Sequence, residues 1–154
     1  MAEFRRTALV TGSATGIGAA AAIALARAGY DVAVNYSRSE EAARATAAEC
    51  EAAGAKTIVV GSDVADDESV RAMVDACRIA FGRLDVLVNN AGITATTPFK
   101  DFDTMDFDDW DRVFSVNVRG LVQVTRACSA MLKETRGCIV NTTSIVGLRP
   151  GPQP

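Results

Sequence analysis

Near its start the chain carries a glycine-rich stretch, TGSATGIG at residues 11–18, whose residue types and spacing suit the binding of a phosphate group. Gly12, Gly16 and Gly18 follow an apolar run and precede residues with helical periodicity. Glycine lets the backbone turn tightly there, so that backbone N–H groups approach a pyrophosphate at the amino end of a helix, where the dipole favours anions. Such a turn can also serve only to pack a helix on a strand, but the strand–turn–helix context favours a dinucleotide site.

If the dinucleotide is a nicotinamide cofactor, the residues at the end of the second apolar run, VNYSRSEE at 34–41, bear on which one is bound. NAD-binding proteins usually place Asp or Glu here to bind the ribose 2′-hydroxyl, whereas a nearby arginine accommodates the 2′-phosphate of NADP. This chain has Tyr36 in the expected acid position and Arg38 two residues later, which favours NADP(H) over NAD(H). Two observations stand against it: Thr15, not a basic residue, precedes Gly16, and Arg38 could be only a solvated charge at a helix start.

Two polar residues in the second half of the chain could act on a substrate. Ser144 follows a strand-like run and so lies beside the crevice where open α/β sheets bind ligands, although serine after a strand is often only a turn former. Asn117 interrupts an apolar helical stripe and is expected to point inward, where a buried amide must be hydrogen-bonded. It is either satisfied by backbone in the core or orders a water near the active site. The stripe consists of Trp110, Val113, Phe114, Leu121, Val124, Thr125 and Cys128.

Metal binding is not indicated by the sequence. The acidic run DFDTMDFDDWD at 101–111 holds six aspartates but lacks the glycine and closing glutamate of a calcium loop, so it is expected to cap and favour the start of the helix that follows. The chain has no histidine, and its cysteines are scattered singly, without the pairing of a zinc site. We expect four reduced core cysteines, Cys50, Cys77, Cys128 and Cys138.

These residues need a framework to position them, and the sequence alternates between strand-like and helix-like segments. Apolar runs of strand length recur at residues 8–10, 31–35, 57–60, 84–88 and 138–140. Strands that are apolar throughout are buried on both faces, as in parallel sheets covered by helices. The pattern predicts an α/β fold of the Rossmann-like, doubly wound type, with about five parallel strands in one domain over residues 1–154.

The segments between the strands have the periodicity and the end signals of helices. One helical face is formed by Val70, Met73, Val74, Cys77 and Phe81. This helix is expected to start at Asp66–Glu68 and to stop at Gly82. Ser37 and Glu40 have the spacing of a capping box ahead of an alanine-rich helix.

Length and charge argue against several other classes of protein. With 154 residues and 49% hydrophobic content, the chain can bury the core of one domain. Its net charge of -3 leaves no basic face for nucleic acid. The apolar run after Arg5 and Arg6 is too short for a signal peptide or a membrane span, so we expect a cytoplasmic protein without a membrane partner.

Together the motifs resemble the N-terminal, cofactor-binding portion of short-chain dehydrogenases/reductases, of the 3-oxoacyl reductase type. TGSATGIG, SDV at 62–64, NNAG at 89–92, NV at 117–118 and NTTS at 141–144 carry the resemblance along nearly the whole chain. It implies an NADP(H)-dependent oxidoreductase that moves a hydride between the nicotinamide and a carbonyl or alcohol carbon of a small molecule. The full-length form would be a homo-oligomer. The implied cofactor-binding residues are Gly12, Ser13, Thr15, Gly16, Ile17, Gly18, Tyr36, Arg38, Asp63, Val64, Asn90, Ala91 and Gly92.

The resemblance also implies individual roles. Asp63 would contact the adenine ring with Val64 beside it, while residues 89–92 would stabilise the central sheet and line the cofactor groove. Asn117 would help to hold a proton relay, and Ser144 would hydrogen-bond the substrate carbonyl. In the strand order 3-2-1-4-5 that the family implies, the fifth strand would be an uncovered edge, open to pairing with another chain.

The family's proton donor is a tyrosine whose phenol is acidified by a lysine, in the pattern Y-x-x-x-K. The only tyrosines here, Tyr30 and Tyr36, lack a lysine at that spacing. The resemblance places the pair just beyond Pro154, which predicts a C-terminally truncated enzyme with an incomplete sheet and an incomplete catalytic set. The alternative is a dinucleotide-binding module without chemistry, such as a sensor or the remnant of a damaged gene.

Overall fold

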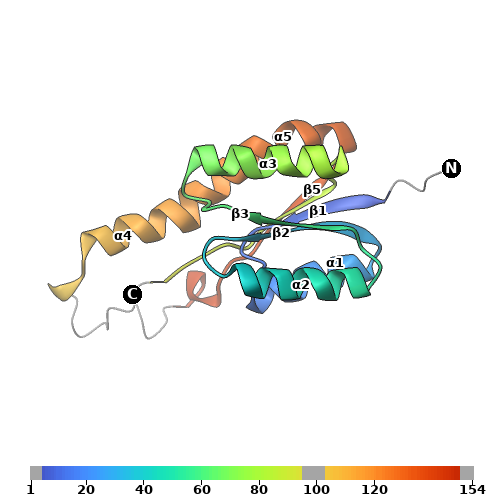
Figure 1. Cartoon of the computed structure of the whole chain (residues 1–154). Coiled ribbons are helices and arrows are strands. Elements are labelled where there is room, and N and C mark those ends of the chain that lie inside the picture. The colour runs from blue at the N-terminus through green and yellow to red at the C-terminus, as the bar shows by residue number, and fades with distance from the viewer. Residues whose placement is uncertain (1–4, 95–102, 150–154) are drawn as a thin grey trace.

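A parallel five-stranded sheet lies between two layers of helices in the computed structural model, which describes residues 5–94 and 103–149 (Figure 1). The strand order is β3-β2-β1-β4-β5, so the expected doubly wound sheet and its order are confirmed. The strands are β1 Arg6–Val10, β2 Tyr30–Tyr36, β3 Thr57–Gly61, β4 Val86–Asn89 and β5 Cys138–Asn141.

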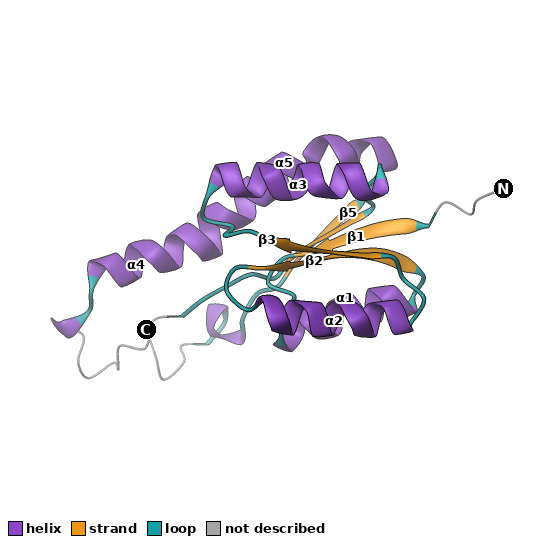
Figure 2. Ribbon diagram, in the orientation of Figure 1, coloured by secondary structure: helices purple, strands orange, loops and turns teal. Residues whose placement is uncertain are grey.

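Helices cover both faces of this sheet (Figure 2). Helices α1 (Gly16–Arg27) and α2 (Glu40–Ala52) pack together on one face, and α3 (Asp67–Phe81) and α5 (Leu121–Thr135) on the other. Helix α4 (Phe107–Phe114) runs through a π-helical turn at 115–120 into α5, and a short 3-10 helix follows β5. In the part of the chain that the structure describes, no helix combines the length and apolar character needed to cross a membrane.

The strand register brings the candidate site together at the carboxyl ends of the strands. Val10 of β1 pairs with Val34 of β2 and with Val88 of β4. The turn after β1 therefore lies between the residues that follow β2 and those that follow β4. Because carboxyl ends of parallel strands meet at one edge, the ligand crevice of such a sheet is expected here.

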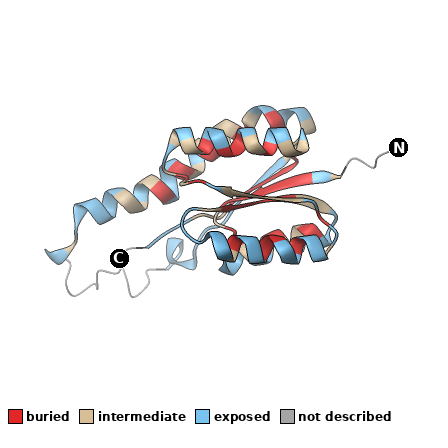
Figure 3. Cartoon of the chain, viewed as in Figure 1, coloured by how far each residue is buried: buried red, intermediate tan, exposed pale blue. Residues whose placement is uncertain are grey.

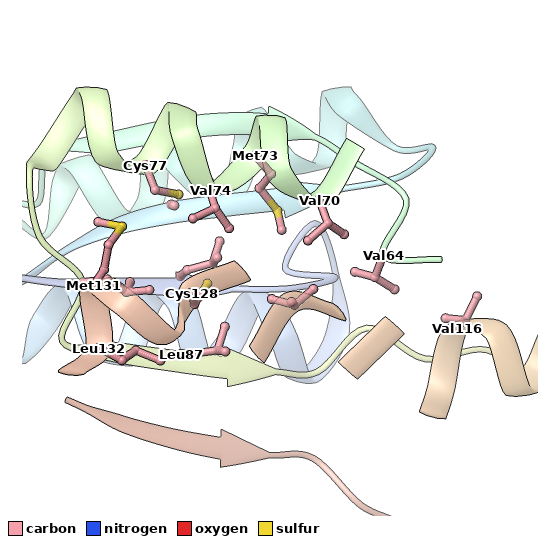
Figure 4. Packing of buried hydrophobic residues seen from close by; sticks show 14 residues of the cluster. Val64, Val70, Met73, Val74, Cys77, Leu87, Val116, Cys128, Met131 and Leu132 are labelled. Carbon is pink, nitrogen blue, oxygen red and sulfur yellow. The ribbon is translucent and has the colours of Figure 1, made fainter. Parts of the chain in front are cut away.

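The core consists of two apolar clusters, one on each face of the sheet. Figure 4 shows the larger cluster, in which the predicted face of α3 points toward Leu87 of β4 and Cys128 of α5. The α3 residues Val70, Met73, Val74 and Cys77 are all buried. The predicted ends of α3 are also confirmed: the Asp66 carboxylate accepts hydrogen bonds from the Glu68 and Ser69 N–H groups, and Gly82 terminates the helix with a φ of 70°.

The two edge strands differ from the expectation that every strand is buried on both faces. All four residues of β5 are exposed, and β3 is only half-buried. On β5, Ile139 is 44% and Val140 is 51% exposed, because only β4 pairs with this strand in the described structure. The expectation for Cys138 is wrong for the same reason: it is exposed, whereas the other three cysteines are buried and all four are free.

The capping box expected at Ser37 and Glu40 is absent from the described structure. Helix α2 begins at Glu40 with Ser39 at the N-cap position, and no side chain caps it. Because Glu40 is the first helical residue, it cannot reach back as the third residue of a capping box does. Its carboxylate instead accepts from the Arg44 guanidinium one turn later, at 2.6 Å.

Helix α4 projects past the end of the sheet, and most of its surface is exposed (Figure 3). Trp110 and Phe114, from the predicted apolar stripe, are 48% and 47% exposed and stack on each other at 5.0 Å, whereas Val124 and Cys128 further along the stripe are buried. The aspartate run behaves as predicted where it is described: the Asp106 carboxylate accepts from the Asp108 N–H at the start of α4. Residues 101–102 of the run lie outside the described residues. Within residues 5–94 and 103–149 no group of three or more His, Cys, Asp or Glu side chains is placed to hold a metal ion.

Candidate functional site

Two glycines of the glycine-rich turn, Gly12 and Gly18, pack so closely against their surroundings that they cannot be replaced without movement. A Cβ on Gly18 would lie 2.4 Å from the Gly12 carbonyl oxygen and 2.5 Å from Asn90 Nδ2. Gly12 has a φ of +62°, and a Cβ there would lie 2.9 Å from Ala91 Cα. Glycine at these two positions is therefore required by close approach, as the sequence pattern indicated.

Asn35, a polar residue inside the apolar strand β2, holds this turn in place. It is 1% exposed, and its Oδ1 accepts from the Gly12 N–H at 3.0 Å while its Nδ2 donates to the Ser62 carbonyl at 3.2 Å. The Asn35 N–H donates to Oγ of the fully buried Ser13 at 2.9 Å. Asn35 thus joins the turn to β2 and to the residues after β3. Sequence reasoning missed it, although a lone amide in an apolar strand is the signal that could have found it.

A second set of hydrogen bonds joins the turn to the segment after β4. Thr11 Oγ1 accepts from the N–H groups of Asn90 and Ala91 at 2.9 and 3.0 Å. In return, Asn90 Nδ2 donates to the carbonyl oxygens of Thr11 and Gly12 at 3.1 and 3.2 Å. These bonds hold Asn90 and Ala91, two of the predicted cofactor-binding residues, beside the turn.

The amino end of α1 has features that favour an anion. Thr15 occupies the N-cap position, no side chain caps the helix, and its first turn carries no acidic residue in the described structure. By contrast, the first turns of α2, α3 and α4 each carry two acidic residues. Since the first N–H groups of a helix lack intrahelical partners and the dipole is positive there, this exposed end favours a bound phosphate.

A cleft of about 170 Å³ opens at the carboxyl ends of the strands. The structure brings six of the predicted cofactor-binding residues to its walls: Gly12, Arg38, Asp63, Val64, Ala91 and Gly92. The sequence reasoning missed the other lining residues, which are Asn35, Ser37, Ser62, Ile93, Arg112 and Val116. Thr15, Gly16 and Ile17 are exposed at the turn outside this cleft. Tyr36 also lies outside it, because its ring packs beside Gly61 and it hydrogen-bonds Glu40.

Asp63 is the one carboxylate among the described residues that line this cleft. Its Oδ1 accepts from the Ala65 N–H at 2.9 Å, and its Oδ2 accepts from the Arg112 guanidinium at 2.7 Å. Burial raises the pKa of Asp63, but these hydrogen bonds and the charges of Arg112 and Arg38 outweigh it and hold the pKa below its usual value. Asp63 is therefore ionised at neutral pH.

The two predicted catalytic residues share a second cavity of about 460 Å³. Ser144 and Asn117 both line it, together with Trp110 and Phe114 of α4. Ile93 lines this cavity as well as the smaller cleft, so the two spaces meet at that residue.

The expectation that Asn117 points into the core is wrong. Asn117 is exposed in the π-helical turn, its Nδ2 donates to the Ile93 carbonyl at 2.8 Å, and its Oδ1 accepts from the Ile93 N–H at 2.9 Å. Its amide is thus satisfied by backbone, but at the surface of the site. The effect is to fix Ile93, where the cleft and the larger cavity meet.

Ser144 is exposed and lies at the start of the short helix after β5, where its Oγ accepts from the Val146 N–H at 3.3 Å. Among the described residues lining the larger cavity there is no tyrosine. Tyr30 lies at the opposite, amino end of β2, where its ring faces the Arg6 guanidinium at 4.5 Å. The site as described therefore combines a glycine-rich turn at an uncapped helix end, a cleft lined by charged side chains, and a cavity lined by Ser144.

The chain is similar to known proteins along almost its whole length. Residues 6–154 match the family model described as short chain dehydrogenase. The 3-oxoacyl-acyl-carrier-protein reductase FabG of Staphylococcus aureus is 40% identical over 146 residues, which cover 94% of this chain and 58% of that protein. An L-rhamnose 1-dehydrogenase (NAD(P)(+)) of a Sphingomonas species is 43% identical over 148 residues, which cover 95% of this chain and 57% of that protein.

Solved structures show the same fold. A short chain dehydrogenase from Burkholderia cenocepacia in complex with NADP has a TM-score of 0.89 and 42% sequence identity, over 96% of this chain and 59% of that one. An NAD+-bound xylitol dehydrogenase has a TM-score of 0.88 and 32% identity, over 98% of this chain and 58% of that one. The chain thus spans less than two thirds of the length of these relatives.

Proposed function

The chain belongs to the short-chain dehydrogenase family of oxidoreductases, and from that premise we propose that it binds NADP(H) as the cofactor portion of an enzyme acting on a carbonyl/hydroxyl pair. The observation that carries the proposal is the pair of cavities that meet at Ile93. One holds the residues that suit a dinucleotide, and the other holds Ser144 and Asn117.

The residues present fit NADP(H). The uncapped end of α1 and the turn held by Asn35 would receive the pyrophosphate. Asp63 and Val64 would lie against the adenine, and Arg38, in the same cleft, would pair with the 2′-phosphate. When bound, the cofactor supplies or accepts the hydride.

The preference for NADP(H) rests on Arg38 and on the lack of an acid at Tyr36, whose side chain packs outside the cleft. We expect NADPH to bind at least tenfold more tightly than NADH, which corresponds to about 1.4 kcal/mol. Isothermal titration calorimetry of the purified chain with each cofactor measures the two affinities and tests this expectation. Equal affinities would refute the preference, and the same preference in Arg38→Ala would exclude Arg38 as its source.

Ser144 is proposed to donate a hydrogen bond from its hydroxyl to the substrate carbonyl oxygen, while Asn117 holds the Ile93 backbone at the meeting point of the two cavities. The alkoxide that forms on reduction also needs a proton, and general acid catalysis contributes roughly 10² to 10⁴ in rate. Neither tyrosine of the 154 residues has a lysine four residues later, and neither lines the cavity of Ser144 in the described structure. We therefore propose that these residues bind cofactor without turning over a carbonyl.

The discriminating experiment compares the 154-residue chain with a version extended along its genomic reading frame. Both are assayed with NADPH on a panel of ketones and 3-oxo thioesters, with Ser144→Ala in the extended version as control. Cofactor binding by both and turnover only by the extended version supports the proposal. Cofactor binding by both without turnover by either supports a dinucleotide-binding module, and absence of binding refutes both. The homo-oligomer expected of the whole protein stays a prediction.

A further inference from the structure

Arg112 reaches across the cofactor cleft to a residue 49 positions earlier in the chain. It comes from α4, and its guanidinium donates to Asp63 Oδ2 at 2.7 Å beyond the end of β3. The two side chains are 40% and 38% exposed, so the pair lies at the surface of the cleft that both residues line. No motif of the sequence pointed to Arg112.

Three charged side chains determine the net charge of this cleft. Its charged lining side chains, among the described residues, are Arg38, Asp63 and Arg112, which leaves a net charge of +1. Both carboxylate oxygens of Asp63 are engaged, one by the Ala65 N–H and one by Arg112. Burial raises the pKa of Asp63, while Arg112 and, more weakly, the charge of Arg38 in the same cleft lower it. Without Arg112, the negative charge of Asp63 would offset the positive charge of Arg38 in the cleft.

We propose that Arg112 is a positioning residue that sets cofactor preference, because it holds Asp63 in place and neutralises its charge beside Arg38. This inference rests on the proposed function, in which Arg38 receives the 2′-phosphate. A phosphate carries a charge near -1.5 to -2, so an unneutralised carboxylate in the same cleft would repel it. NADH has no 2′-phosphate, so the repulsion falls mainly on NADPH.

The readout is the ratio of the dissociation constants for NADH and NADPH, measured by calorimetry on the chain itself. The ratio cancels whatever Asp63 contributes to binding adenine, because both cofactors carry that ring. In Arg112→Gln the ratio should fall roughly threefold to tenfold, the effect of about one uncompensated surface charge. Arg112→Lys keeps the charge and should retain most of the ratio.

The double variant separates neutralisation from direct contact with the phosphate. Asp63→Asn combined with Arg112→Gln restores the net charge of the cleft to +1, so it should return the ratio close to the unsubstituted value. Arg119→Gln is the matched control, because it removes the same charge from the adjoining π-helical turn but does not line the cleft. Its ratio should not change, and circular dichroism confirms that all variants are folded.

Several outcomes would overturn the inference. It fails if the ratio in Arg112→Gln is unchanged or matches that of Arg119→Gln. It also fails if the double variant stays as low as Arg112→Gln, because Arg112 would then bind the phosphate itself. Equal affinities of the unsubstituted chain for the two cofactors would instead refute the cofactor preference of the proposed function, while a ratio that still falls in Arg112→Gln would support the role of Arg112.

Discussion

Replacing Gly18 by alanine would place a methyl group where three parts of the candidate site meet. The new Cβ would lie 2.4 Å from the Gly12 carbonyl oxygen, 2.5 Å from Asn90 Nδ2 and 2.9 Å from Ser13 Cα. Two of these atoms belong to the backbone, so they cannot swing aside as a flexible side chain could. The turn or the Asn90 side chain must therefore move.

The loss of stability follows from these contacts. Overpacking of this kind costs about 1–3 kcal/mol. Displacing the Asn90 carboxamide breaks its hydrogen bonds to the Thr11 and Gly12 carbonyls, at about 0.5–1.5 kcal/mol each. The better helix propensity of alanine returns about 1 kcal/mol, because Gly18 lies in the first turn of α1. We expect the free energy of unfolding to fall by about 3 kcal/mol.

Urea unfolding followed by circular dichroism measures this loss, with Gly16→Ala as the matched control. Gly16 also lies in the turn, with a φ of +60°, but a Cβ there would meet no atom within 4 Å. Only backbone strain of about 1–2 kcal/mol is expected at that position. A loss in Gly18→Ala no greater than that in Gly16→Ala would refute the argument from close approach.

Three further predictions concern other parts of the chain. The buried Asp85 carboxylate accepts from the Thr7 N–H and the Arg83 guanidinium; burial raises its pKa, but these partners outweigh it and lower the pKa. The stabilisation by Asp85 is therefore fully present above the unfolded pKa near 3.9 and is lost as the pH falls through the lower folded pKa. Asp85→Asn should lower the free energy of unfolding by about 2 kcal/mol at pH 7 and should weaken its decrease at acidic pH, measured by urea unfolding over a pH series. An unchanged decrease at acidic pH would contradict this. The exposed strand β5 should make the 154-residue chain associate at tens of micromolar, and Val140→Lys should reduce the association in size-exclusion chromatography; a monomer without the substitution would count against it. The same chain should show no NADPH-dependent carbonyl reduction by cofactor absorbance, and turnover would mean that a residue assigned here to structure delivers the proton.

Features that depend on neighbours in the sequence were predicted well. The face of α3 and its ends at Asp66 and Gly82 follow from side chains within a few residues of one another. The glycines of the turn after β1 were also recognised, because the turn and the helix that follows it are local structures. The alternation of strands and helices then left few topologies to choose from.

Features that depend on what covers a residue were predicted poorly. The stripe through Trp110 and Asn117 has helical spacing, but α4 extends past the sheet, so none of the α4 residues of the stripe is fully buried in the described structure. Cys138 has the apolar character of a core residue, yet it lies on an edge strand. Periodicity states which residues share a face, and it does not state what that face meets.

The sequence by itself determined the family, the sheet and the glycine-rich turn, because each of these depends on short stretches whose backbone preferences and apolar spacing are set locally. Only the tertiary structure decided that Asn35 supports the turn and that Asn117 holds Ile93. It also decided that Arg112 neutralises Asp63, a contact between residues 49 positions apart. Such contacts come from the register of parallel strands and the placement of helices across them, which bring distant residues together without any local signal.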